Sequence, residues 1–178
     1  KATGIDFDED KLEDDFNAMS DVLMANASWN TFMYRDFQSR NVMIKDGEPW
    51  FIDFQGGRRG PFYYDVASFL WQAKANLPDY LRQDLLNEYL ASVNRYVKIG
   101  RDEFLATMRH FVLFRTLQVL GAYGFRGYFE KKPHFMQSVP YALANLRELL
   151  RKPYEEYPYL NELLNRLVNL KQFTDELT

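Results

Sequence analysis

Hydrophobic residues follow a helical spacing at the start of the chain, change to the pattern of short strands near residue 42, and return to helical spacing after residue 61. In residues 8–27, Leu12, Phe16, Met19 and Leu23 are separated by three or four positions, which predicts an amphipathic helix. The first turn of this segment is acidic, and carboxylates suit the positive end of a helix dipole. We therefore expect a helix that buries one apolar face.

Residues 42–54 have a different pattern. Two short runs, Val42–Lys45 and Trp50–Phe54, flank the pair Asp46-Gly47. Asp-Gly is a favoured two-residue turn because glycine tolerates a positive φ. The pattern predicts a tight β-hairpin over residues 42–54, followed by a glycine-rich, basic loop at residues 55–61.

The rest of the chain has the periodicity and proline placement of helices. The predicted helices cover residues 61–75, 78–98, 101–129, 133–151 and 158–171. Pro140 predicts a kink or break within the fourth of them. There is no internal repeat, low-complexity segment or long linker, so the order of elements predicts one α-rich α+β domain over residues 1–178.

Composition narrows the classes of function. The chain has 178 residues, 47% of them hydrophobic and 17% aromatic, which excludes a disordered protein. A formal net charge of −3 gives no electrostatic reason to expect a nucleic-acid partner. No apolar run reaches the roughly eighteen residues of a membrane span, and without cysteine there is no disulfide or cysteine-bound metal. We expect a cytoplasmic protein with no membrane partner.

Candidate chemistry is concentrated just before and just after the predicted hairpin. Asp36 and Asn41 lie in a polar segment that ends where the hairpin begins, and Asp53 follows 53 − 36 = 17 positions after the first aspartate. Phosphoryl transfer needs an aligned acceptor hydroxyl and cations that neutralise the phosphates. One carboxylate can serve the hydroxyl, while a carboxylate and an amide oxygen are suitable ligands for Mg²⁺.

This combination resembles a known family. Asp-x-x-x-x-Asn, a short hairpin and the Ile52-Asp53-Phe54 sequence are similar to protein-kinase-like enzymes. The continuation through Gly60-Pro61 and Tyr64-Asp65-Val66-Ala67 resembles the aminoglycoside phosphotransferases, in particular the bacterial branch that phosphorylates cell-wall amino sugars. The resemblance implies the C-terminal lobe of a protein-kinase-like fold, mainly helical with a short β-hairpin at the catalytic loop.

The same resemblance implies roles for individual residues. Asp36 is expected to orient and deprotonate the acceptor hydroxyl, and Asn41 and Asp53 to bind Mg²⁺. Arg35 and Asp65 are expected to support the catalytic loop.

A second group has less definite roles. Gln55, Arg58 and Arg59 are candidates for contact with a substrate or phosphate, and an exposed structural role for the two arginines remains open. Gly56 and Gly57 are expected to turn the chain, with a phosphate cradle as the alternative.

Two features depart from the family pattern. Tyr34 stands where histidine is usual. The amino-terminal, nucleotide-binding lobe is expected to be absent, because the first lysines, Lys1 and Lys11, lie at a terminus and on a polar helix rather than on a phosphate-binding strand.

Together these features predict a phosphotransferase that uses ATP and Mg²⁺ to phosphorylate a hydroxyl of a small molecule, a sugar or amino sugar. Residues 1–178 alone are expected to be inactive without the missing lobe. The alternatives are a degenerate kinase-like domain that binds without catalysis, and a helical interaction module in which the motif is accidental.

Overall fold

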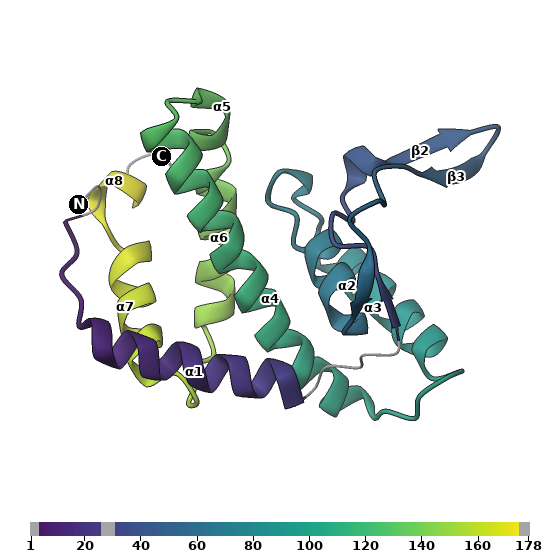
Figure 1. The fold of residues 1–178 in the computed structure, drawn as a ribbon, viewed down its shortest axis with the longest axis horizontal. Helices are drawn as coiled ribbons and strands as arrows, with labels where there is room; N and C mark the ends of the chain where they lie inside the picture. The colour runs from purple at the N-terminus through teal and green to yellow at the C-terminus, as the bar shows by residue number, and fades with distance from the viewer. Residues whose placement is uncertain (1–3, 26–30, 175–178) are drawn as a thin grey trace. The chain divides into compact units, whose positions relative to one another are not determined.

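The computed structural model describes residues 4–25 and 31–174 and confirms an α-rich chain with a few short strands (Figure 1). The helices are α1 Glu9–Ala25, α2 Phe62–Leu70, α3 Asp79–Val93, α4 Arg101–Gly124, α5 Pro133–Met136, α6 Val139–Leu150, α7 Pro158–Val168 and α8 Lys171–Thr174. The strands are β1 Thr31–Met33, β2 Val42–Lys45, β3 Glu48–Phe51 and β4 Arg58–Gly60. Two 3-10 turns, η1 Ser39–Asn41 and η2 Ala73–Ala75, and a π-helical turn, η3 Phe125–Phe129, complete the elements.

The predicted hairpin is confirmed at its turn and shortened at its end. Strands β2 and β3 pair antiparallel, and Asp46 and Gly47 have φ values of 54° and 83°. Two successive left-handed residues form the turn that matches the twist of a hairpin. Strand β3 ends at Phe51 rather than at Phe54, because the chain turns sharply at Asp53, where φ is 66°.

The predicted loop at residues 55–61 contains a strand that the sequence pattern did not indicate. Strand β4 pairs antiparallel with β1, so that Phe32 lies opposite Arg59 and Met33 opposite Arg58. Each strand has only three residues, too few to show an alternation of polar and apolar positions. Their pairing depends on segments far apart in the sequence, which local patterns do not report.

Helix boundaries follow the prolines. The segment predicted as one helix from Pro133 is divided into α5 and α6, and Pro140 lies in the first turn of α6. Proline has no N–H to donate and is tolerated in a first turn, where that N–H has no helical partner. The predicted break is therefore confirmed. The predicted helix at residues 8–27 is α1; residues 26 and 27, like Lys1, lie outside the described residues.

Contacts divide the chain into two compact units, here named the terminal unit (Lys1–Ala25 with Thr116–Thr178) and the hairpin unit (Asn26–Arg115). The prediction of one domain over residues 1–178 stays a prediction. None of the helices in the described part of the chain is both long enough and apolar enough to cross a bilayer.

The hairpin unit has an aromatic core beneath the candidate site. The ring of Tyr63 on α2 stacks on those of Phe104 and Phe111 on α4, with centroids 5.4 and 5.1 Å apart. Ala67 and Leu70 on α2 are buried in the same core. Helix α2 is thus packed against α4, while the β2–β3 hairpin extends away from α2 and α3 (Figure 1).

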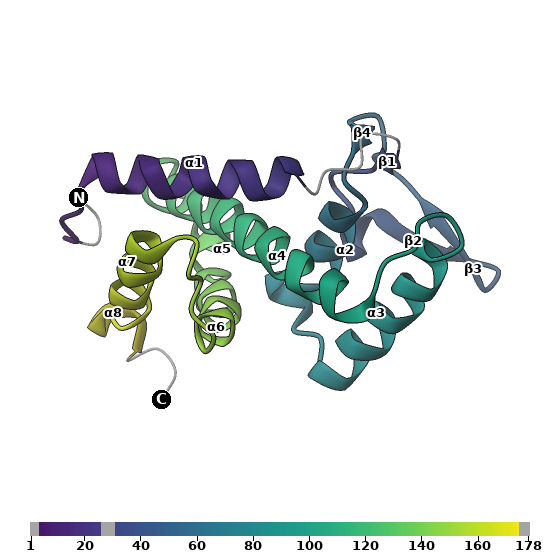
Figure 2. The same cartoon turned by 90° about the horizontal axis from the view of Figure 1, so that it is seen from below.

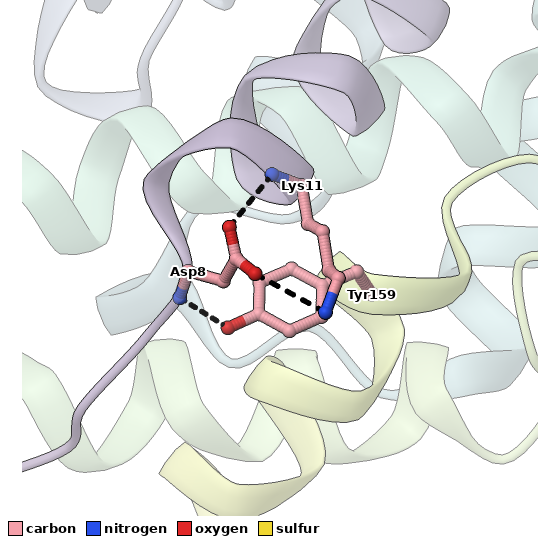
Figure 3. Close-up of polar contacts among 3 residues, drawn as sticks. All are labelled: Asp8, Lys11 and Tyr159. Carbon is pink, nitrogen blue, oxygen red and sulfur yellow. Dashed lines mark hydrogen bonds and ion pairs between the residues drawn. The ribbon is translucent and has the colours of Figure 1, made fainter.

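The terminal unit is built on α7, which contacts both α1 and α6 (Figure 2). Buried Asp15 of α1 accepts a hydrogen bond from the Leu160 N–H in the first turn of α7, at 2.5 Å. The Asp8 N–H donates to the Tyr159 hydroxyl at 2.6 Å, and the Asp8 carboxylate accepts the Lys11 N–H (Figure 3). These contacts fix the start of α1 against α7.

Candidate active site

Asp65, in the first turns of α2, holds the start of the candidate catalytic loop. Its two carboxylate oxygens accept hydrogen bonds from the main-chain N–H groups of Tyr34 and Arg35, at 2.5 and 2.9 Å. Arg35 has a φ of 78°, a left-handed conformation that costs free energy in a non-glycine residue and persists where its surroundings enforce it. The paired hydrogen bonds supply that enforcement and support the predicted bracing role of Asp65.

The environment of Asp65 raises the pKa of its carboxyl above the ordinary value. Partial burial raises the pKa of its carboxyl, and the two main-chain N–H groups and the positive charge of Arg115 oppose that rise. Arg115 is itself held on α4, where its Nε donates to the Ser68 hydroxyl at 3.0 Å. Asp65 therefore lies on α2 in the electrostatic field of an arginine that is hydrogen-bonded to the same helix.

Tyr34 connects the loop to the end of the hairpin. Its hydroxyl donates a hydrogen bond to the main-chain carbonyl of Ile52, the residue before Asp53. Burial raises the pKa of the Tyr34 phenol, and the negative charges of Asp53, Asp36 and Asp65 raise it further. The hydroxyl thus lies in the electrostatic field of the three aspartates that the sequence analysis identified as candidate site residues.

Asn41 is hydrogen-bonded both to Asp36 and to Ile52, the residue before Asp53. Its side chain is 5% exposed, and its Nδ2 donates to the main-chain carbonyl of Asp36 at 2.8 Å. The Ile52 N–H donates to the Asn41 carbonyl at 3.1 Å, which continues the hairpin pairing one step beyond the strands. Asp53 is the next residue, so the hairpin returns the second aspartate to the neighbourhood of the asparagine.

Asp53 and Asn41 offer a donor set that fits Mg²⁺. Asp53 is exposed, and one of its oxygens accepts the Gln55 Nε2 at 2.6 Å. The Asn41 Nδ2 is used in its bond to the Asp36 carbonyl, and the amide oxygen is the atom of this side chain that can act as a metal ligand. A carboxylate and an amide oxygen suit a hard cation that retains several waters. No group of three or more His, Cys, Asp or Glu side chains able to hold a metal occurs among the described residues.

The remaining predicted residues lie around the turn after the hairpin. Arg35 donates from its guanidinium to the Gly56 carbonyl at 3.3 Å, which ties the loop to this turn. Arg58 and Arg59 are exposed on β4. A β-carbon on Gly57 would lie 2.5 Å from the ring of Phe32, so a larger residue at this position would have to displace that ring.

Two features of the site had no sequence signal. Gln72, two residues beyond the end of α2, accepts the Ser39 N–H at 3.0 Å. A cavity of about 590 Å³ also opens beside the loop. Its lining is largely aromatic and comprises Phe32, Tyr34, Phe37, Pro49, Trp50, Phe51, Phe54, Asp65 and Tyr89. Both features join residues that are distant in sequence.

Comparison with known proteins identifies relatives of the chain. The chain is 31% identical over 140 residues to an N-acetylmuramate/N-acetylglucosamine kinase of Neisseria meningitidis serogroup B, which covers 77% of this chain and 42% of that protein. It is 28% identical over 147 residues to proteins of the same name from Pseudomonas aeruginosa and Pseudomonas putida, with 76% and 80% of this chain covered. The chain spans about two fifths of the length of these relatives: 42%, 41% and 43%.

The model of the phosphotransferase enzyme family, APH, matches residues 4–103, which is 100 of the 178 residues and includes the whole motif segment. The resemblance drawn from the sequence and the kinase-like fold that it implies are therefore confirmed. On this match, together with the catalytic-loop motif and the hairpin that follows it, the chain belongs to the phosphotransferase enzyme family.

Proposed function

We propose that the intact protein containing this chain transfers a phosphoryl group from ATP to a hydroxyl of a sugar or amino sugar. The observation that carries the proposal is the hydrogen-bonded arrangement of the loop, in which Asp65 holds its start and Asn41 bonds to the main chain of Asp36. The relatives named as N-acetylmuramate/N-acetylglucosamine kinases support the choice of acceptor.

Asp36 is the proposed general base. Its side chain is exposed, so it is accessible to an acceptor, while its main-chain carbonyl is fixed by Asn41 at 2.8 Å. A carboxylate within hydrogen-bonding reach of the acceptor hydroxyl orients that oxygen and accepts its proton as the bond to phosphorus forms. Fixing the backbone while leaving the carboxylate accessible meets both requirements.

Asn41 and Asp53 are the residues that would hold Mg²⁺, and the ion supplies neutralisation of the charge on the ATP phosphates. The left-handed backbone of Asp53 (φ 66°) turns the chain out of β3 at this residue. The Tyr34 hydroxyl bonds to the preceding carbonyl and so limits the movement of that turn. Tyr34, the departure from the family histidine, retains a supporting contact, which favours a competent enzyme over a degenerate one.

The rest of the nucleotide site is proposed to come from residues outside this chain. The chain spans about two fifths of its relatives' length. Large apolar side chains are exposed in this part of the chain: Trp50 and Phe54, which line the cavity, are 57% and 59% exposed, and Ile44 on β2 is 70% exposed. Contiguous exposed apolar surface is typical of an interaction site. The proposal therefore includes a nucleotide-binding lobe that covers this surface, without which residues 1–178 have negligible activity.

The test is a phosphotransferase assay of the intact protein. ADP formation from ATP and Mg²⁺ is measured with N-acetylmuramate, N-acetylglucosamine and an aminoglycoside as acceptors. Asp36→Ala is expected to lower the rate by about 10²–10⁴, the usual effect of removing a general base. Asp84→Ala, which removes an exposed carboxylate on α3, is the matched control. Absence of acceptor-dependent ADP formation in the wild type, or near-normal turnover by Asp36→Ala, would contradict the proposal.

A further inference from the structure

The catalytic loop ends in a helical turn that has no local cap. The turn is η1, and its N-cap residue, Gln38, makes no side-chain hydrogen bond to it. The first N–H groups of any helix have no partner within the helix and need one from elsewhere. Here the Gln72 side-chain oxygen supplies it by accepting the Ser39 N–H at 3.0 Å.

Gln72 is well placed to act as a fixed support. Its main-chain N–H donates to the Phe69 carbonyl at 3.4 Å, and its carbonyl accepts the Ala75 N–H at 3.0 Å. The preceding residue, Trp71, stacks against the guanidinium of Arg82 at 5.3 Å. The main chain at Gln72 is therefore held by hydrogen bonds on both sides, and the side chain extends from this fixed point to the loop.

Helix α2 and the residues just after it hold the loop at two points. Asp65, on α2, accepts the N–H groups at the start of the loop, and Gln72, just beyond α2, accepts the N–H of Ser39 near its end. Gln72 lies two residues beyond the last residue of α2, so both supports come from one short segment of the chain. Along the chain, Asp36 therefore lies between two residues, Arg35 and Ser39, whose N–H groups are held by this segment.

We propose that Gln72 is a positioning residue for the catalytic loop, acting through η1 on Asn41. Asn41 is the last residue of η1, and its N–H donates to the Gln38 carbonyl at 2.9 Å. A displacement of η1 therefore moves the Asn41 amide relative to the Asp36 carbonyl that it contacts. The effect on catalysis rests on the proposed function, whereas the hydrogen bond between Ser39 and Gln72 does not.

The experiment compares three variants of the intact protein. Gln72→Met keeps the length of the side chain without the acceptor, Gln72→Glu keeps an acceptor oxygen, and Gln83→Met is a matched control at an exposed position of α3. Gln72→Met is expected to lower kcat about 3- to 10-fold, the value of one hydrogen bond. The Mg²⁺ concentration for half-maximal rate is expected to rise, the acceptor KM to stay constant, and Gln72→Glu to restore kcat.

A second measurement separates this inference from the proposed function. Hydrogen exchange of the Ser39 amide is expected to be about 3- to 10-fold faster in Gln72→Met than in the wild type or in Gln83→Met. If the wild type transfers no phosphoryl group, the proposed function fails and amide exchange alone decides the contact. The inference would be overturned if the Ser39 amide exchanged at the wild-type rate in Gln72→Met. It would also be overturned if, in an active enzyme, Gln72→Met had the kcat and the Mg²⁺ dependence of the wild type.

Discussion

The hydroxyl of Tyr34 donates a hydrogen bond to the main-chain carbonyl of Ile52. This contact joins the residue that opens the catalytic-loop motif to the residue that precedes the second aspartate. The hydrogen bond is expected to contribute to stability and to limit the position of Asp53. The three carboxylates near the phenol raise its pKa, so the contribution is expected to depend on pH.

Tyr34→Phe is expected to destabilise the protein by about 1 kcal/mol, because it removes one hydrogen bond and leaves the Ile52 carbonyl without this donor. The measurement is the free energy of unfolding from urea denaturation. Tyr96→Phe is the control, since Tyr96 is 89% exposed and the substitution removes the same atom. Equal unfolding free energies for the two variants would contradict the role of the contact.

The Tyr34 phenol is expected to ionise above the ordinary tyrosine value of 10.0, because burial and neighbouring carboxylates raise its pKa. A raised pKa means that the folded state retains a proton that the unfolded chain loses. Its contribution to stability is therefore complete below about pH 10 and declines as the pH rises further. The difference in phenolate absorbance between wild type and Tyr34→Phe reports this titration. A midpoint at or below 10.0 would exclude the raised value.

Asp65→Ala is expected to cost about 1–3 kcal/mol of stability, because the main-chain N–H groups of Tyr34 and Arg35 lose their acceptor. In the intact enzyme we also expect a large fall in kcat, since the left-handed Arg35 loses its support. Asp65→Asn, which keeps one acceptor oxygen, should be intermediate. Asp84→Ala serves again as the control. Wild-type urea denaturation of Asp65→Ala would show that Asp65 does not brace the loop.

Asp15→Ala is expected to destabilise the terminal unit by about 1–3 kcal/mol. Asp15 is buried and accepts the Leu160 N–H at 2.5 Å, so its removal leaves a helix N-terminus without a partner and without a favourable negative charge. Its exposed neighbour Asp14 provides the control Asp14→Ala on the same helix. Far-ultraviolet circular dichroism during urea denaturation measures both, and indistinguishable midpoints would exclude the capping role.

Short-range signals predicted much of the candidate site. The Asp46-Gly47 turn fixes the hairpin because few other pairs adopt two successive positive φ values. The hairpin in turn determines that Asp53 returns toward Asn41. The roles assigned to Asp36, Asn41 and Asp53 stay predictions until the variants are measured.

Contacts between distant segments were not predictable. The β1–β4 pair, the bond from Ser39 to Gln72 and the cavity beside the loop each join segments that local periodicity treats separately. The sequence placed residue 72 in a continuous helix, whereas α2 ends at Leu70 and the side chain of Gln72 reaches the loop. A glutamine carries no pattern that distinguishes an exposed position from a cap.

The amino-acid sequence by itself determined the helical segments, the hairpin turn and the order of the motif residues, because these depend on interactions among near neighbours. The resemblance to a known family already implied that Asp65 supports the loop, and only the tertiary structure decided which atoms it holds and that Gln72 and the Tyr34 hydroxyl make further contacts. Asp65, Gln72 and the Tyr34 hydroxyl find their partners 31, 33 and 18 positions away. The packing of α2 against the core places Asp65 and Gln72 beside the loop, and the hairpin places Ile52 beside Tyr34. No local preference encodes these contacts.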